Sequence, residues 1–124
     1  MSQFVNSSSK GYVATAALGD GILVKIVAGQ VVVATAATDK MIGVTVGAVA
    51  AGETGSIRLR SCYGTTKVKA GGTIVVGDRL TSDATGRSIA TVTAANEVIG
   101  MALEAGVVGD FVEIMPANTL YAIT

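Results

Sequence analysis

One pattern of glycines, turn residues and short apolar runs occurs twice in this chain, about 57 residues apart. Residues 29–57 align without a gap on residues 86–114. Further upstream, residues 19–22 match residues 77–80 if one residue is inserted. The positions identical in both copies are Gly29, Ala37, Ile42, Gly43, Ala48, Gly52 and Ile57. We therefore predict an internal duplication, with quasi-repeats at about residues 19–60 and 77–116.

Each copy has the pattern of a sheet. From residue 19 onward, turn residues recur about every 8–12 residues, which is typical of an all-β domain. Glycines between the apolar runs adopt positive φ at little steric cost. The sequence predicts strands at residues 22–27, 30–35, 41–46, 56–60, 66–69, 73–76, 88–93, 98–103 and 111–115. We expect a compact, small β-barrel or β-tulip-like domain over residues 19–124.

The composition favours self-association. Half of the residues are apolar, but the chain has 16 Gly, no Trp, two Phe and three Tyr, so its core is built from small side chains. Small side chains bury little apolar area each. All nine Lys and Arg lie within residues 1–87, whereas residues 88–124 contain four acids and no cation. The two parts either meet in neighbouring copies, as in a ring, or pair within one chain; we expect a homotrimer.

The first 18 residues differ from the rest. They are mostly polar, with a Ser-rich stretch at residues 7–9 and two apolar pairs, Phe4-Val5 and Tyr12-Val13. They form either a disordered terminus or an extended arm that becomes ordered on a partner. In the second case the two apolar pairs anchor the arm by strand addition.

No catalytic or cofactor site is expected. The chain has no His, which removes the commonest general base and metal ligand. Its single cysteine, Cys62, has no His to activate it, and most acids lie in turns, where Asp commonly bonds the backbone. The balanced charge does not indicate a nucleic-acid partner, and no segment has the length and composition of a secretory signal or membrane span. We expect a non-enzymatic protein made in a cytoplasm.

One group of cations has a regular spacing. Arg58 and Arg60 alternate with apolar residues, as do Lys67 and Lys69. Period two places each pair on one face of a strand, and the intervening turn brings the two strands together. The resulting basic patch either docks on an acidic protein surface or is a solvated sheet face that deters edge pairing.

Residues 66–78 resemble the small hammerhead sheets of lipoyl and biotinyl carriers. Those carriers modify a lysine at a tight hairpin tip, whereas Lys67 and Lys69 lie within a predicted strand and no Met-Lys-Met occurs. A carrier or small-molecule-binding β module is the alternative function.

The stronger resemblance is to the small, glycine- and valine-rich decoration (cement) proteins of phage capsids, and it covers residues 19–115. The segments that carry it are residues 41–44, 50–53, 68–78, 82–87, 98–105 and 109–114. The resemblance implies a compact β domain, usually trimeric, that sits on the outside of an assembled phage head and clamps neighbouring major capsid proteins. It carries over no catalytic residues. The capsid-contact residues expected from the arm and the basic patch are Phe4, Val5, Tyr12, Val13, Arg58, Arg60, Lys67 and Lys69.

Overall fold

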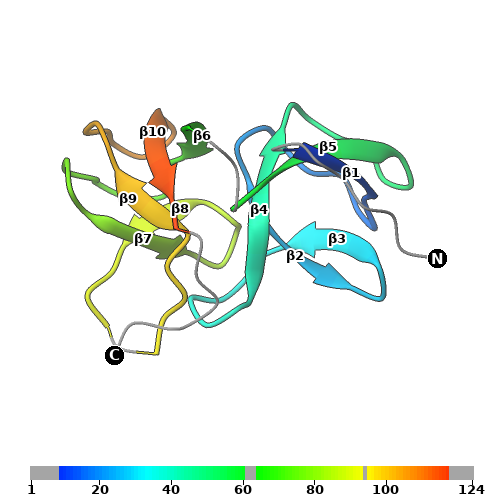
Figure 1. Cartoon of the computed structure of the whole chain (residues 1–124), viewed down its shortest axis with the longest axis horizontal. Coiled ribbons are helices and arrows are strands. Elements are labelled where there is room, and N and C mark those ends of the chain that lie inside the picture. Colours follow the sequence, from blue (N-terminus) through cyan, green and yellow to red (C-terminus); the bar gives the residue numbers. More distant parts are fainter. Residues whose placement is uncertain (1–8, 61–63, 94, 118–124) are drawn as a thin grey trace.

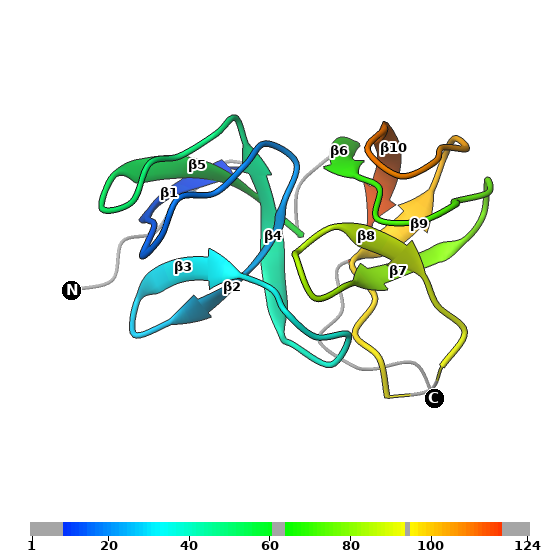
Figure 2. The ribbon, with the colours of Figure 1, turned by 180° about the vertical axis from the view of Figure 1, so that it is seen from behind.

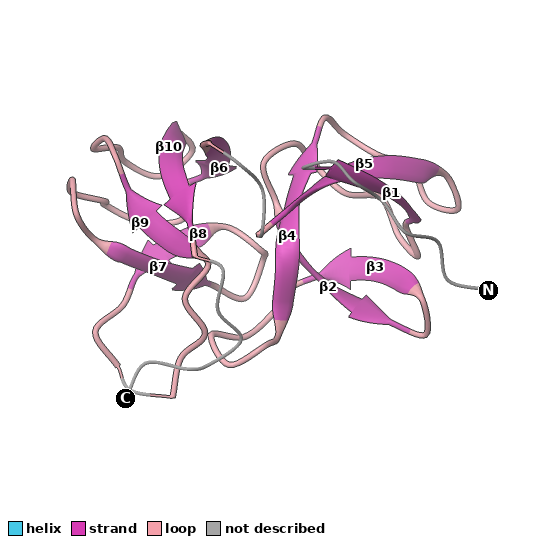
Figure 3. Cartoon of the chain, in the orientation of Figure 1, coloured by secondary structure: helices cyan, strands magenta, loops and turns pink. Residues whose placement is uncertain are grey.

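The computed structural model describes residues 9–60, 64–93 and 95–117, and within these ranges the chain consists of strands and loops (Figure 3). The expectation of an all-β protein is confirmed. None of the described residues forms a helix that is long and apolar enough to cross a membrane. The strands are β1 (Ser9–Val13), β2 (Leu23–Val27), β3 (Gln30–Val33), β4 (Met41–Val46), β5 (Thr54–Leu59), β6 (Thr66–Lys69), β7 (Arg79–Ser82), β8 (Ser88–Ala90), β9 (Gly100–Ala102) and β10 (Phe111–Pro116).

The strands form two antiparallel five-stranded sheets that lie side by side (Figure 1). The strand order is β1-β5-β4-β2-β3 in the first sheet and β6-β10-β9-β7-β8 in the second. The same order therefore occurs twice, once in each half of the chain. We call β1–β5 the first repeat and β6–β10 the second repeat; each begins one strand earlier than the sequence pattern predicts.

The register is also the same in both repeats. Val13 pairs with Thr54 in the first sheet, and Lys69 pairs with Phe111 in the second. These pairs are offset by 56 residues on the first strand and by 57 on its partner. The same two offsets relate the Val24–Val33 pair to the Leu80–Ala90 pair.

The extra residue of the second repeat therefore lies in the β7–β8 turn. The β2–β3 turn has two residues, Ala28 and Gly29, both with positive φ. In the longer β7–β8 turn, Asp83 accepts hydrogen bonds from the N–H groups of Thr85 and Arg87. This placement corrects the upstream alignment, because Gly21, and not Gly19, is the counterpart of Gly77.

The expected barrel is not closed. Each sheet curls until the residue after its first strand meets the opposite edge strand, but only at one parallel bridge. That bridge joins Ala14 to Val31 in the first sheet and Ala70 to Ser88 in the second. One bridge does not pair the edge strands along their length, so the sheets stay open.

Residues 9–18 belong to the domain. β1 pairs with β5 over its whole length, and Ala14 and Leu18 are buried in the core of the first sheet. Within this range the expected separate arm over residues 1–18 is therefore wrong, because these residues complete a sheet edge of their own chain. The expected contacts at Phe4 and Val5 lie outside the described residues.

The core has two parts. One cluster belongs to the first sheet and centres on Val24, Val31 and Ile57. The larger cluster fills the second sheet and also includes Leu23 and Met41 of the first repeat, among others. The two repeats therefore share one core, and the end of the first sheet is buried against the second.

Candidate interaction surfaces

The fold divides the predicted basic patch. Arg58 lies in β5 of the first sheet, whereas Lys67 and Lys69 lie in β6 of the second, and these two strands do not pair. Alternation on β6 is as expected, because Val68 between the two lysines is fully buried. The structure thus places Lys67 and Lys69 on one face, apart from the β5 cations.

Both lysines have neighbours within the second repeat. The Lys67 Nζ lies 3.8 Å from a Glu104 carboxylate oxygen, and the Lys69 Nζ lies 6.0 Å from the centre of the Phe111 ring. Exposed ion pairs of this kind contribute about 0–1 kcal/mol. The two lysines are therefore accessible to a partner at little cost to the fold.

Arg60 is not part of an exposed patch, which corrects its expected role in docking. Its side chain is only 6% exposed. Its guanidinium donates hydrogen bonds to the carbonyl oxygens of Met41, Val98 and Ala117. It therefore joins the first sheet to the second, and it is buried because it follows β5 at the point where the chain crosses between them.

Arg60 is paired with a buried acid, Glu97, which is 1% exposed. The Arg60 Nη1 lies 3.4 Å from one carboxylate oxygen of Glu97, and the Lys40 Nζ lies 3.7 Å from the other. Burial lowers the pKa of Arg60, and the attraction of Glu97 partly offsets this effect. Because an isolated buried charge is costly, the pair requires both partners.

Tyr12 and Val13 are strand residues. In β1 they pair with Gly55 and Thr54, and Tyr12 packs partly buried against the core of the first sheet. Both are therefore held by their own chain. Cys62 and Tyr63, which flank the predicted basic patch in the sequence, lie outside the described residues.

The sequence analysis missed an apolar surface at the outer end of the second sheet. Two turns of identical sequence, Val-Val-Gly-Asp, lie there at residues 75–78 and 107–110. Both views of the ribbon show the β6–β7 and β9–β10 turns next to each other, away from the first sheet (Figures 1 and 2). An antiparallel bridge between Ile74 and Gly106 joins the segments that lead into them. We call the four valines of these turns the valine tip; they are Val75, Val76, Val107 and Val108.

The two turns have the same internal bonding. In each, the Asp N–H donates to the carbonyl of the first Val, and the N–H of that Val donates to the Asp carboxylate, over 2.9–3.0 Å. The expectation that Asp78 and Asp110 bond the backbone is confirmed. The predicted strand at residues 73–76 is wrong, because its second half is this turn. Fixed in the turns, the four valines are 56–62% exposed.

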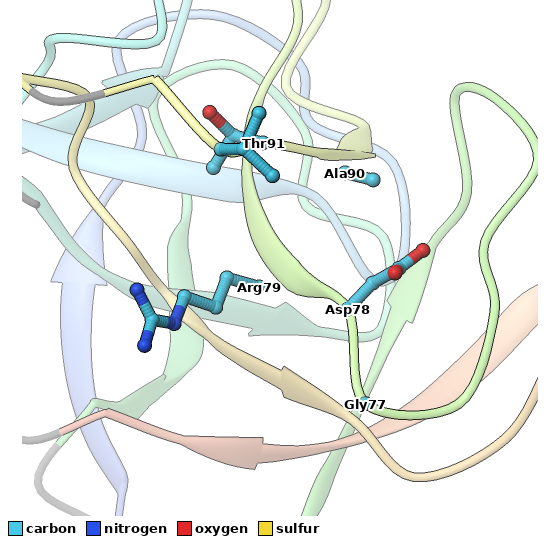
Figure 4. A pocket seen from close by; sticks show the side chains of 6 residues that line it. Gly77, Asp78, Arg79, Ala90 and Thr91 are labelled. Carbon is cyan, nitrogen blue, oxygen red and sulfur yellow. The ribbon is translucent and has the colours of Figure 1, made fainter.

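A pocket of about 260 Å³ lies elsewhere on the second repeat. Asp78 and Arg79 line one side of it, and Ala90 and Thr91 line another (Figure 4). The Thr91 N–H donates to the Arg79 carbonyl over 2.8 Å, which fixes the two segments against each other. The described residues contain no cluster of three metal-ligating side chains here or elsewhere.

Known proteins place this fold in a biological context. No curated protein sequence matches the chain. The sequence model of the phage cement protein family matches residues 21–114, which is most of the chain. The chain belongs to the phage cement protein family. This cement protein is thus a structural protein of a phage, as its sequence resemblance implies.

A solved structure shares the fold of this cement protein. It is the crystal structure of the head fiber gp8.5 N base in bacteriophage phi29. The likeness covers 90% of this chain and 95% of that chain, with a TM-score of 0.75 and 23% sequence identity. The two-sheet architecture of the cement protein therefore also occurs in a phage head fiber.

Proposed function

We propose that this cement protein binds the outside of an assembled phage head and stabilises it by clamping neighbouring major capsid proteins. The observation that carries the proposal is the family match over residues 21–114. In this proposal the protein is made in the host cytoplasm, acts as a homotrimer without enzymatic activity, and ends on the virion surface. Weak contacts then add across the copies of each oligomer.

The valine tip is the surface that we assign to the capsid. Its four valines are more than half exposed and belong to rigid turns, so covering them removes apolar area from water without ordering a loop. The matching turns of the first repeat carry Gly19, Asp20, Ala50 and Ala51. The apolar character of this end is therefore specific to the second repeat and is not required by the fold.

The other contacts keep their place as predictions. Lys67 and Lys69 are accessible and suit an acidic capsid surface, and Phe4 and Val5 suit an anchor on it. Lys67 and Lys69 lie inside β6 and not at a hairpin tip, so the geometry does not favour the alternative of a lipoyl- or biotinyl-type carrier.

The test is sedimentation of the protein with undecorated heads. We expect Val76→Asp with Val108→Asp to weaken head binding at least about tenfold, which corresponds to about 1.4 kcal/mol. The matched control is Ala51→Asp, which puts the same charge on the turn of the first repeat that corresponds to Val108. Equal binding by the double variant and the control would remove the valine tip from the proposal. Failure of the unmodified protein to sediment with any head would remove the proposed function.

A further inference from the structure

A turn of the second repeat fills a niche in the first. The Leu23 N–H donates to the carbonyl of Gly86, in the β7–β8 turn, over 2.8 Å. A Cβ atom at Gly86 would lie 2.6 Å from Val33 Cγ2 and 2.7 Å from Ile22 Cγ2. The turn is thus seated so closely that only glycine fits. Next to it, the Ser82 hydroxyl donates to the Ala34 carbonyl and is buried.

The same place in the second repeat is the open pocket. The register makes Asp78, Arg79 and Ala90 the counterparts of Ile22, Leu23 and Val33. The backbone around the two places matches, since the bond from Thr91 N–H to the Arg79 carbonyl has its counterpart in the bond from Ala34 N–H to the Leu23 carbonyl, at 2.9 Å. No described residue of the chain fills the pocket as Gly86 fills the niche.

The counterpart of the inserted turn is free. Gly29 of the β2–β3 turn corresponds to Gly86, and both have a φ of 79°. A Cβ atom at Gly29 would have nothing within 4 Å, in contrast to the close fit around Gly86. Ile26 corresponds to the buried Ser82, yet it is 44% exposed. Each chain therefore has one unused turn on its first repeat and one unfilled niche on its second.

We propose that the β2–β3 turn of one copy inserts into the pocket of the next copy, so that copies join head to tail. This contact repeats between chains the contact that joins the two repeats within each chain. It rests on the self-association in the proposed function and names the surfaces that make it. A contact of this kind uses two different surfaces, so it closes into a ring or extends as an open chain, according to the rotation between copies.

The lining of the pocket suits a backbone turn. In the niche, one N–H group, that of Leu23, bonds the turn. In the pocket, the N–H of Arg79 holds the corresponding position in the sheet, and its guanidinium adds five donors that match turn carbonyls. The carbonyl of Gly29 is the expected acceptor, as the carbonyl of Gly86 is in the niche. Ile26 would lose its exposure beside the loop that follows Ala90.

The turn is tested with Gly29→Asn. Asn tolerates positive φ better than other side chains, and the free turn has room for it. In the pocket the new side chain would clash, as one at Gly86 would in the niche. The matched control is Gly52→Asn, because Gly52 has a φ of 80° and equally open surroundings. In sedimentation velocity, we expect Gly29→Asn to raise the dissociation constant of the oligomer at least about tenfold, and Gly52→Asn to leave it unchanged.

The pocket is tested with Ala90→Trp, which fills the space that the turn would occupy. Ala90 is exposed, so the folded chain accommodates the ring. Its control is Ala51→Trp at an exposed turn of the first repeat. Gly29→Asn leaves the pocket intact, and Ala90→Trp leaves the turn intact. A mixture of the two variants should therefore form dimers with one copy of each, while either variant alone stays monomeric.

Unchanged oligomers of both variants, with melting temperatures equal to those of their controls, would overturn the head-to-tail contact and leave self-association standing. A monomeric unmodified protein at tens of micromolar would overturn both. Head binding by the unmodified protein is read separately by sedimentation with heads. Failure of the contact and failure of the capsid function are thus distinguishable.

Discussion

The first and second repeats have the same strand order and register, but their ends differ. In the first repeat the end of β2 is covered by a turn of the second, whereas the matching end of β7 borders an open pocket. At the opposite end, the first repeat has Gly, Asp and Ala where the second has four exposed valines. Backbone ladders and glycine turns are shared because they set the fold, while outward side chains are free to differ. The duplicated fold thus carries two different surfaces.

The connection between the repeats also uses positions that differ. Arg60 bonds the Ala117 carbonyl, and Ala117 is its own counterpart in the second repeat. The register supports this match, because the Arg60 N–H donates to the Ile42 carbonyl and the Ala117 N–H donates to the Ile99 carbonyl. One repeat supplies the buried cation, and the other supplies the backbone and Glu97 that receive it.

The largest effect is expected from breaking this connection. Arg60→Met should lower the free energy of unfolding by about 3–5 kcal/mol, because it leaves Glu97 buried without its closest cation. Urea unfolding monitored by circular dichroism measures the loss. Lys67→Met, at an exposed ion pair, is the control and should change stability by less than about 0.5 kcal/mol. A double variant, Arg60→Met with Glu97→Met, should lose less than Arg60→Met alone; an equal or larger loss would show that the pair is not the source of the effect.

A second pair of variants tests whether the repeats are structurally equal. A Cβ atom at Gly43 would lie 2.2 Å from the Arg58 carbonyl oxygen, and one at the matching Gly100 would lie 2.4 Å from the Met115 carbonyl oxygen. We expect Gly43→Ala and Gly100→Ala each to cost about 1–3 kcal/mol, because the paired strand must move. Gly72→Ala, where the nearest atom is 3.7 Å away, is the control in the same urea measurement. A large loss at only one of the two sites would mean that the repeats differ in packing as well as in surface.

The smallest effect concerns pH and a turn that differs in charge. Burial by itself raises the pKa of Asp39, but bonds from the Thr35 and Ala36 N–H groups and the Lys25 ammonium outweigh it and lower the pKa below its ordinary value. A lowered pKa stabilises the fold above the unfolded value of about 3.9, and this contribution is lost as pH falls through the folded value. The counterpart in the second repeat is Asn96, which does not titrate.

Asp39→Asn should therefore cost about 1 kcal/mol at pH 7. The difference from the unmodified protein should shrink toward zero as the pH drops below 3.9. Urea unfolding at several pH values measures it, with Asp83→Asn in the second repeat as a comparison. A constant difference across this pH range would mean that the charge of Asp39 contributes nothing.

Several elements followed directly from the sequence. The ungapped match of residues 29–57 to 86–114 reflects β3–β5 and β8–β10, whose offset is constant in the structure. The alternation of Lys67, Val68 and Lys69 correctly placed Val68 in the core. These features are local, since they depend on strand period and on the residues that each turn accepts.

Other elements required long-range contacts. β1 was missed because its sequence, with Ser9, Lys10 and Gly11, is polar for a strand, and pairing with β5 stabilises it. The strand expected at residues 73–76 is a turn, because Asp78 closes it. The valine tip had a signal in the repeated Val-Val-Gly-Asp, but a sequence does not show whether apolar turn residues face solvent or a core.

By itself, the sequence determined an all-β chain with two copies of one pattern, because the spacing of apolar residues and glycines fixes strands and turns locally. It also determined the absence of histidine chemistry. Only the tertiary structure decided that the barrel stays open, that Arg60 is buried between the sheets, and that one niche is filled while its counterpart is empty. These outcomes depend on how the two sheets pack, and packing compares burial, charge and hydrogen bonding among residues far apart in the chain.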